Sequence, residues 1–282
     1  MIIVESPGFY TTVQDRGRYG FRHLGVPVAG PMDHQAFDLA NALLPHANDA
    51  CVFECTLIGP SLILEEEVRF VVTGAPIAIL LNGVALVMNK VYCAPKNSKL
   101  ELGKVLNGMR SYLRLEAELI TPVVLKSKSF YVPITSQRSI AKGDVLSYTS
   151  RTLTAEKNNA QLRVVDDYIS SKSLEVSPGP DWALLTNKQQ QQLMDEPHRV
   201  EAQNRMGYRL TSSVKVNAPA LLSQLVVPGM VQLTPGGKLL VATADCQVTG
   251  GYLQVVQLDA SSLNSLVQKR EGEVLTFRNK HR

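Results

Sequence analysis

Residues 8–44 read GFYTTVQDRGRYGFRHLGVPVAGPMDHQAFDLANALL, and residues 53–60 close the same stretch with FECTLIGP. Polar side chains are dense here and lie among glycines and prolines, which make rigid turns. Loops of this kind let several groups converge on one ligand. An ordinary turn-rich β segment with solvated charges is the alternative, because turns favour Gly, Pro and Asp for purely local reasons.

The apolar pattern changes its period between Met32 and Leu44. Apolar residues recur there at helical spacing, Asp33 stands near the start, and Pro45 ends the pattern. Short β-branched runs separated by turns follow, and Asn82-Gly83 between two apolar runs predicts a hairpin. We therefore predict a mainly β fold, a barrel or a sandwich, with a short helix.

The whole chain has 282 residues, of which 45% are hydrophobic, and a formal net charge of +4. This length allows one large domain or two ordinary ones, and the composition is typical of a soluble protein. The charge is modest and its basic cluster at the C-terminus is short, so no nucleic-acid partner is expected. Neither a signal peptide nor a membrane-spanning apolar run is visible, and we expect a cytoplasmic protein.

The four cysteines, Cys51, Cys55, Cys93 and Cys246, form no CxxC motif. The histidines stand at no zinc-like spacing from them, so we predict no metal site. Cys51 and Cys55 flank a Val-Phe-Glu run that is expected to be buried, and they are interpreted as small core residues rather than as metal or redox groups.

The second half of the chain follows a polar stretch at residues 151–173, and we place the boundary between two domains, 1–160 and 161–282, within it. Asp181 is predicted to cap a second helix that runs through Trp182 to Met194 and ends at Pro197. Strands are expected again for the remainder, as far as Phe277.

The two halves resemble each other faintly. QDRGRYGFR at residues 14–22 is echoed by QNRMGYR at residues 203–209, and FECTLIGP at residues 53–60 by VQLTPGG at residues 231–237. Because the turn motifs stand in the same order, the economical interpretation is two copies of one β-barrel unit, each with a short helix.

No phosphate-binding or nucleophile motif is complete. PGGK at residues 235–238 lacks the earlier glycine and the following Ser/Thr of a phosphate loop, so a hairpin turn is expected there. Gly-x-Ser-x-Gly and HExxH are both absent from the sequence.

The most suggestive piece of the second half is ADCQVTGGY at residues 244–252. Asp245, Gln247 and Thr249 alternate, so on a strand their side chains would share one face. Together they can polarise a small amide or carboxylate substrate and position water; the polar outer face of an edge strand is the alternative. Asn204-Arg205 suits a carboxylate or phosphate, or is a structural pair at a turn.

Ordered motifs in both halves resemble those of one known family. TTVQDRGRYG, HLGVPVAGPMD, the ANALL helix and ECTLIGP are similar to the N-terminal signature of the allophanate hydrolase subunit 2 family, which contains the C-type subunit of 5-oxoprolinase and is also called the biotin-dependent carboxyltransferase family. SPGPDW, NRMGYRL, PGMVQLTPGG and ADCQVTGGY resemble its C-terminal signatures. The resemblance covers roughly residues 1–90 and 174–280 and implies two cyclophilin-like β-barrel domains.

The resemblance also implies that the protein functions as a subunit of a complex. Family members act with a partner related to allophanate hydrolase subunit 1, and with a third subunit they form 5-oxoprolinase, which uses ATP to open 5-oxoproline to glutamate. In urea carboxylase the equivalent pair, fused, transfers a carboxylate from biotin to urea. Some members were described as antagonists of a sporulation kinase inhibitor.

The family motifs assign candidate site residues to positions of this sequence. The candidate catalytic residues are Asp15, Asp245, Gln247 and Thr249. The candidate substrate-binding residues are Arg18, Asp33, Asn41, Glu54, Asn204, Arg205, Gln232 and Tyr252. Asp15 and Asp245 are the candidates for activating water or the amide, and Arg205 for holding a substrate carboxylate.

The middle of the chain departs from the family pattern. A Gly-Gly stretch that usually follows the YLAV-like strand is replaced within YLRLEAEL at residues 112–119, and a GSRST-like loop by KSKSF at residues 126–130. Cys246 replaces a basic residue of the C-terminal motif. Side chains thus stand where glycines let a backbone approach a ligand, which bears on substrate choice and on activity.

These observations predict a subunit of an ATP-dependent 5-oxoprolinase-type amidohydrolase that is active only with its partner subunits. ATP is expected to be used by the complex, since no nucleotide loop of known pattern is visible. One alternative is a carboxyltransferase-type subunit acting on a urea-like amide, with biotin attached to another chain. The other is a non-catalytic regulatory or scaffold subunit, which the lost glycines favour.

Overall fold

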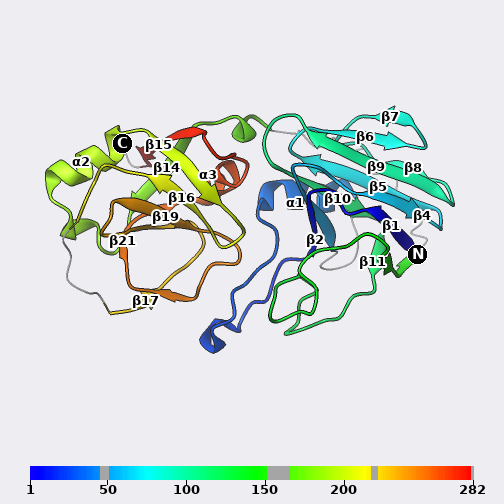
Figure 1. Cartoon of the computed structure of the whole chain (residues 1–282), viewed down its shortest axis with the longest axis horizontal. Helices are drawn as coiled ribbons and strands as arrows, with labels where there is room; N and C mark the ends of the chain where they lie inside the picture. Colours follow the sequence, from blue (N-terminus) through cyan, green and yellow to red (C-terminus); the bar gives the residue numbers. More distant parts are fainter. Residues whose placement is uncertain (45–50, 151–165, 217–221, 281–282) are drawn as a thin grey trace. The chain divides into compact units, whose positions relative to one another are not determined.

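The computed structural model describes residues 1–44, 51–150, 166–216 and 222–280 and divides the chain into two units. The first unit contains Met1–Gly17 and Asp33–Asp166, and the second contains Arg18–Met32 and Asp167–Arg282 (Figure 1). The predicted boundary at residues 160 and 161 lies outside the described residues. The sequence does not predict the assignment of Arg18–Met32 to the second unit.

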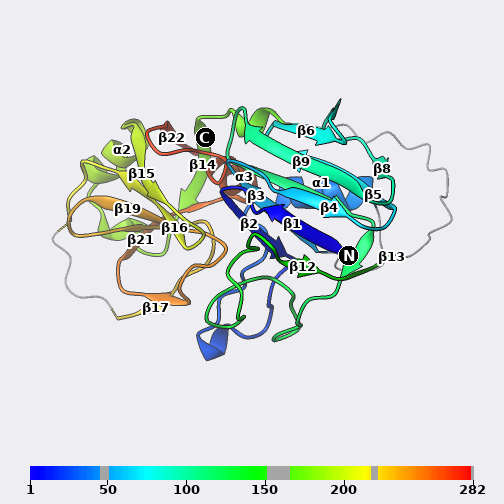
Figure 2. The same ribbon diagram turned by 45° about the vertical axis from the view of Figure 1, so that its right-hand side comes forward.

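The strands of the first unit are β1 Ile2–Ser6, β2 Tyr10–Gln14, β3 Val52–Thr56, β4 Ser61–Leu64, β5 Val68–Gly74, β6 Ile77–Leu81, β7 Val84–Leu86, β8 Tyr92–Ala94, β9 Ser98–Val105, β10 Arg110–Leu115, β11 Ala117–Leu119, β12 Val145–Leu146 and β13 Tyr148–Ser150. One sheet has the order β12-β1-β4-β9-β6-β7 (Figure 2). A second has the order β2-β3-β10-β5-β8, and β11 pairs with β13.

The two main sheets of the first unit share one hydrophobic core. It combines Ile2 and Leu62 of the six-stranded sheet with Phe53 and Leu113 of the five-stranded sheet. β6 alternates buried and exposed residues, as expected of a strand with one solvated face. The predicted hairpin at Asn82-Gly83 is confirmed, since it joins β6 to β7.

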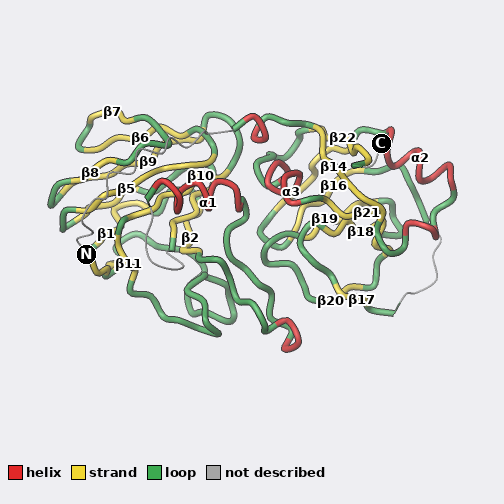
Figure 3. The backbone as a smooth tube through the Cα atoms, turned by 180° about the vertical axis from the view of Figure 1, so that it is seen from behind, coloured by secondary structure: helices red, strands yellow, loops and turns green. Residues whose placement is uncertain are grey.

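Helix α1 (His34–Leu43) covers the other face of the five-stranded sheet, against β5 and β10 (Figure 3). Every residue of β10 is therefore buried, because the strand has the core on one side and the helix on the other. Asp33 is the N-cap of α1, and its Oδ1 accepts a hydrogen bond from the Ala36 amide at 3.0 Å. The helix predicted between Met32 and Leu44 is confirmed.

The strands of the second unit are β14 Ser173–Pro178, β15 His198–Gln203, β16 Gly207–Thr211, β17 Gln224–Leu225, β18 Met230–Leu233, β19 Lys238–Ala242, β20 Thr249–Gly250, β21 Leu253–Leu258 and β22 Val274–Asn279. Seven of them close a barrel in the order β14-β21-β18-β19-β16-β15-β22, and β17 pairs with β20. The barrel encloses its own core, which includes Leu174, Leu210, Val231 and Leu239. The prediction of a mainly β fold is confirmed.

The helices of the second unit correct two expectations. They are α2 Asn187–Asp195 and α3 Ala260–Leu266, with short 3-10 turns η1 Arg22–Leu24, η2 Asp167–Ile169 and η3 Trp182–Leu184. The predicted start at Asp181 is wrong, because Thr186 is the N-cap of α2. The Thr186 side chain accepts from the Gln189 amide and the Gln189 side chain accepts from the Thr186 amide, which together form a capping box. The carboxylate of Asp181 instead accepts from the Gln254 amide at 2.8 Å. α3 lies where only strands were expected.

Among residues 1–44, 51–150, 166–216 and 222–280, no helix is both long enough and apolar enough to cross a lipid bilayer.

Candidate functional site

A row of polar side chains crosses the five-stranded sheet beneath α1. Thr12, Glu54, Tyr112 and Thr73 are cross-strand neighbours on β2, β3, β10 and β5, and all four are buried. Cross-strand neighbours share a face of the sheet. The hydroxyl of Thr73 donates to the carbonyl of Ala36 in α1 at 2.7 Å, so the row lies on the face that the helix covers. Burying polar side chains is unfavourable unless they are hydrogen-bonded, so four of them side by side are not ordinary core packing. This row is therefore the main candidate site of the first unit.

Glu54 is the charged member of this row and is 1% exposed. Its Oε2 accepts a hydrogen bond from the Tyr112 hydroxyl at 2.9 Å, and the same hydroxyl accepts one from the backbone amide of Asp33 at 2.7 Å. Burial, together with the Glu54 and Asp33 charges, raises the pKa of Tyr112 well above its ordinary value. The structure therefore links the predicted residues Asp33 and Glu54 through a tyrosine that keeps its proton.

Asp15, a predicted catalytic residue, binds the KSKSF loop. Its Oδ1 accepts hydrogen bonds from the hydroxyls of Ser127 and Ser129, both at 2.6 Å, and its Oδ2 accepts one from the Lys128 amide at 2.6 Å. Lys126, at the start of the loop, has a φ of 63°, in the left-handed region that favours glycine. This geometry favours a role for Asp15 in holding the loop.

Asn41 and Arg18 lie in different units. Asn41, in α1, donates to the Phe37 carbonyl at 3.0 Å and accepts from Nε of Arg114 at 3.2 Å. Burial lowers the pKa of Arg114 to about 10, so Asn41 is a partner for a buried guanidinium. Arg18 is fully buried in the second unit, where its amide donates to the Val28 carbonyl at 2.7 Å.

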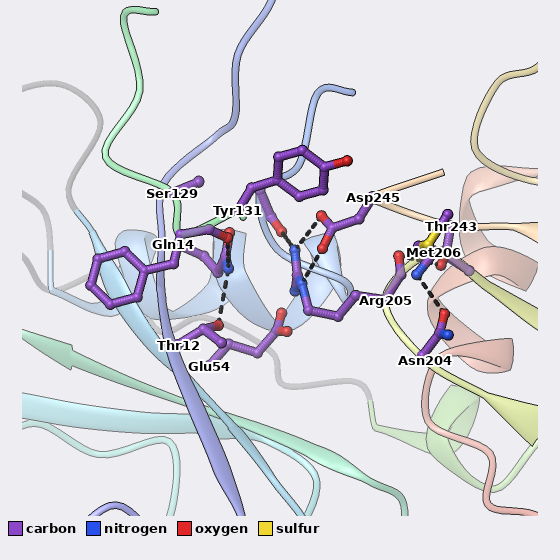
Figure 4. A network of polar contacts seen from close by, with 12 residues as sticks. Thr12, Gln14, Glu54, Ser129, Tyr131, Asn204, Arg205, Met206, Thr243 and Asp245 are labelled. Carbon is purple, nitrogen blue, oxygen red and sulfur yellow. Dashed lines mark hydrogen bonds and ion pairs between the residues drawn. The ribbon is translucent and has the colours of Figure 1, made fainter. Parts of the chain in front are cut away.

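A buried ion pair between Arg205 and Asp245 is the main candidate site of the second unit (Figure 4). Nε of Arg205 donates to Oδ2 of Asp245 at 2.8 Å, and Nη2 donates to Oδ1 at 3.0 Å and to the Gly30 carbonyl at 2.6 Å. Each side chain is only 9% exposed. A bidentate pair of this kind is strong and rigid. Asp245 as an activator of water, or Arg205 as a binder of a substrate carboxylate, would have to give up hydrogen bonds to the other member of the pair.

Asp245, Gln247 and Thr249 do not share a strand face, and the prediction from their alternation is wrong. Asp245 lies in a turn in which the Cys246 amide donates to the Thr243 carbonyl at 3.0 Å. Thr249 alone of the three belongs to a strand, the two-residue β20. Asp245 is buried, whereas Gln247 and Thr249 are exposed. The turn interrupts the extended backbone on which alternation depends.

The other predicted residues of the second unit, Asn204, Gln232 and Tyr252, do not form one cluster with the Arg205–Asp245 pair in the hydrogen bonds described below. Oδ1 of Asn204 accepts from two amides of its own hairpin turn, between β15 and β16, at 2.7 and 3.1 Å. Gln232 is buried on β18, and its Oε1 accepts from Nε2 of Gln247 at 3.4 Å. Tyr252 is 44% exposed. The structure thus brings Gln232 and Gln247 together, while Asn204 stabilises its turn.

The PGGK segment is the hairpin turn between β18 and β19, as predicted. The Gly237 amide donates to the Thr234 carbonyl and the Lys238 amide to the Thr234 hydroxyl, both at 3.0 Å. The ammonium of Lys238 binds the carboxylate of Glu201. These donors are engaged within the protein, so the segment does not fit a triphosphate. Within the described ranges, no group of three or more His, Cys, Asp or Glu side chains is arranged to hold a metal ion.

The cysteines behave as packing residues where they are buried. Cys51 and Cys55 belong to the core of the first unit, which confirms their interpretation from the sequence. Burial raises the pKa of both thiols to about 12. At neutral pH they are protonated and unreactive.

Two surface hollows of the second unit contain none of the predicted site residues. One, of about 610 Å³, is lined by charged side chains such as Arg209 and Glu201, which pair with each other. The other, of about 830 Å³, lies between α2 and the end of β22 and is lined by Trp182 and Met194. The buried polar networks, rather than these hollows, therefore define the candidate sites.

Tyr112, Ser127 and Ser129 belong to these networks but are not singled out by the sequence. Tyr112 stands beside Leu113 in the strand Arg110–Leu115, and a tyrosine next to a leucine in a strand usually packs in the core. Ser129 binds Asp15 across 114 positions of sequence. A signal existed, because these three residues keep the Tyr of the YLAV-like strand and the two Ser of the GSRST-like loop within stretches that otherwise depart from the family pattern.

The chain matches the family model described as "Carboxyltransferase domain, subdomain A and B" over residues 24–279. It is 28% identical to the C-type subunit of 5-oxoprolinase from Escherichia coli, over 98% of this chain and 90% of that protein. It is 34% identical to the urea amidolyase of Lachancea kluyveri over 63% of this chain, a region that is 9% of that protein.

Among solved structures, the crystal structure of TTHA0988 is similar with a TM-score of 0.87 and 28% identity. The similarity covers 98% of this chain, which spans 55% of the length of that relative. Together with the family match, it confirms the resemblance that the motifs carry and shows that the fold is shared.

Proposed function

Because the chain belongs to the family of carboxyltransferase domains with subdomains A and B, we propose that it is a subunit of a 5-oxoprolinase-type amidohydrolase. In this proposal it opens 5-oxoproline to glutamate together with partner subunits. The observation that carries the proposal is the similarity to the C-type subunit of 5-oxoprolinase, which extends over 98% of this chain and 90% of the relative.

Opening a cyclic amide requires a base that activates water and donors that stabilise the developing oxyanion. Glu54 supports the first requirement, because it is a buried carboxylate held by the Tyr112 hydroxyl. Asp15 is engaged by its loop and Asp245 by Arg205. We therefore assign the proton transfer to Glu54 and supporting roles to Asp15 and Asp245.

ATP and the partner subunits belong to this proposal. We assign ATP binding to another subunit, since the amides of the PGGK turn are engaged by Thr234. The partners proposed are a subunit related to allophanate hydrolase subunit 1 and a third 5-oxoprolinase subunit.

The test is glutamate release from 5-oxoproline, with and without ATP, by the chain alone and after co-expression with its partner subunits. Turnover is expected only with ATP and the complete complex, and Glu54→Gln is expected to reduce it by about 100-fold or more, the usual effect of losing a general base. Glu101→Gln, on a partly exposed strand position beside Lys99, is the matched control. An assembled complex without turnover would reject this substrate.

A second candidate is carboxyl transfer to a urea-like amide, which the similarity to urea amidolyase favours. Biotin would then be carried by another chain. Incubation of the complex with a carboxybiotin carrier and urea would give carboxylated urea in this case. If Glu54→Gln changes neither reaction while the complex still assembles and turns over, Glu54 does not carry the proton transfer.

A further inference from the structure

We propose that Tyr112 is a positioning residue that holds Glu54 as a fixed hydrogen-bond acceptor, an inference that rests on the function proposed above. Tyr112 itself touches no substrate in this proposal. It acts through Glu54, whose Oε2 lies 2.9 Å from the tyrosine oxygen. Neither the motifs nor the comparisons assign a role to this tyrosine.

The direction of the hydrogen bond follows from the partners of the hydroxyl. The Asp33 amide is a donor and lies 2.7 Å from the Tyr112 oxygen, so that oxygen must accept there. A phenol has a single proton, which is therefore left for Glu54. Since the hydroxyl donates, Glu54 accepts at Oε2.

The fold fixes both ends of this link. Glu54 and Tyr112 are direct cross-strand partners on β3 and β10, and both are buried. Asp33 is held because its own carboxylate caps α1. The start of the helix, the tyrosine and the carboxylate therefore form one chain of hydrogen bonds, anchored to the sheet and to α1.

Other titratable groups of the first unit also face this link. Asp33 and His34 approach it from α1, Arg110 from β10, and Cys55 lies on the strand of Glu54. Burial lowers the pKa of His34, although the charges of Asp38 and Glu54 oppose this change. His34 is therefore neutral at neutral pH.

Simple core packing is the alternative role for Tyr112, whose ring lies in a small cluster with Ala36, Phe37 and Val52. Tyr112→Phe separates the two roles, because it keeps the ring and removes only the hydroxyl. Tyr208→Phe is the matched control in the second unit. Tyr208 is also buried, but its hydroxyl donates to backbone carbonyls of Val267 and Lys269, at 3.1 and 3.3 Å.

The first measurement is kcat and KM of glutamate release by the assembled complex. Losing the donor leaves Glu54 less firmly positioned, so kcat of Tyr112→Phe should fall about tenfold, as for the loss of one hydrogen bond to a charged group, while KM stays unchanged. Tyr208→Phe should leave both constants unchanged. Equal kcat values for Tyr112→Phe and wild type would overturn the proposal.

The second measurement is independent of activity. In the full chain labelled with carboxyl-13C glutamate, the NMR signal of Glu54 is identified as the one that is lost in Glu54→Gln. Its chemical shift at neutral pH should change in Tyr112→Phe, which removes the hydrogen bond to Oε2, and should stay at the wild-type value in Tyr208→Phe. A changed Glu54 signal without any turnover supports the link and rejects the proposed function. Turnover with an unchanged Glu54 signal supports the proposed function and rejects the link.

Discussion

Asp15 is expected to stabilise the loop at residues 127–129. Both carboxylate oxygens accept hydrogen bonds there, so an Asn at this position places an NH₂ group against donors. We expect Asp15→Asn to lower the free energy of unfolding by about 2 kcal/mol, the typical penalty for unsatisfied buried donors. Urea denaturation measures this change.

Asp38→Asn is the matched control, because Asp38 pairs with Arg16 on the surface, where both side chains are 52% exposed. Exposed ion pairs contribute less than about 1 kcal/mol. Equal losses for the two variants would contradict a loop-holding role for Asp15.

The Arg205–Asp245 pair is expected to show strong coupling. Removing one partner leaves a buried charge, so Arg205→Met and Asp245→Asn should each destabilise the protein by about 3 kcal/mol. The double variant should lose clearly less than the sum, with a coupling energy above about 1.5 kcal/mol. Urea denaturation of the four proteins gives this value.

The Arg209–Glu201 pair, whose side chains are 52% and 25% exposed, offers a comparison within the same barrel. Its coupling is expected to stay below about 1 kcal/mol. Similar coupling energies for both pairs would mean that the Arg205–Asp245 pair is more solvated than its geometry indicates.

At the scale of elements, the stability that the Asp259 cap gives to α3 is expected to fall at acidic pH. Asp259 caps this helix by accepting from the Ser262 amide at 2.8 Å and pairs with Lys280 at 3.3 Å. Burial alone would raise the pKa of Asp259, but the Ser262 hydrogen bonds and Lys280 outweigh it and lower the pKa below the ordinary value. Its stabilisation is therefore complete above about pH 4, the ordinary Asp range, and is lost as the pH falls through the lowered pKa.

Asp259→Asn tests this sign, because Asn is also a good N-cap but carries no charge. Urea denaturation should show wild type more stable than the variant at about pH 6, and this difference should shrink towards about pH 3. A difference that does not change with pH would show that the charge of Asp259 does not contribute.

At the scale of the whole molecule, the division of the N-terminal stretch between units is testable. Arg16 pairs with Asp38 in the first unit, whereas Nη2 of Arg22 donates to the Val226 carbonyl in the second. Hydrogen exchange followed by mass spectrometry should show Arg22→Ala losing protection around residues 224–229, with the strands of the first unit unchanged.

Arg16→Ala should affect α1 instead, since its guanidinium also lies over the Phe37 ring, 5.4 Å from the centroid. Arg16 and Arg22 are close in sequence but contact different units, so each alanine variant serves as the control for the other. Loss of protection in the first unit for Arg22→Ala would contradict the assignment of Arg18–Met32 to the second unit.

The sequence by itself determined the local features of this protein. Helical spacing and the cap at Asp33 predicted α1, Asn82-Gly83 predicted a hairpin, and apolar surroundings predicted buried cysteines. These signals depend on neighbours a few positions apart, through side-chain period and turn geometry. α3 escaped prediction because its Ser- and Asn-rich sequence has weak helix propensity, and a tertiary contact with β14 supports it.

Only the tertiary structure decided which polar groups meet. Tyr112 reaches Glu54 across 58 positions, and Arg205 reaches Asp245 across 40. Such partners are chosen by strand order, register and burial, and a sequence pattern with a short period carries none of this information. The motifs therefore identified Glu54, Arg205 and Asp245 as candidates, and the fold alone assigned their partners.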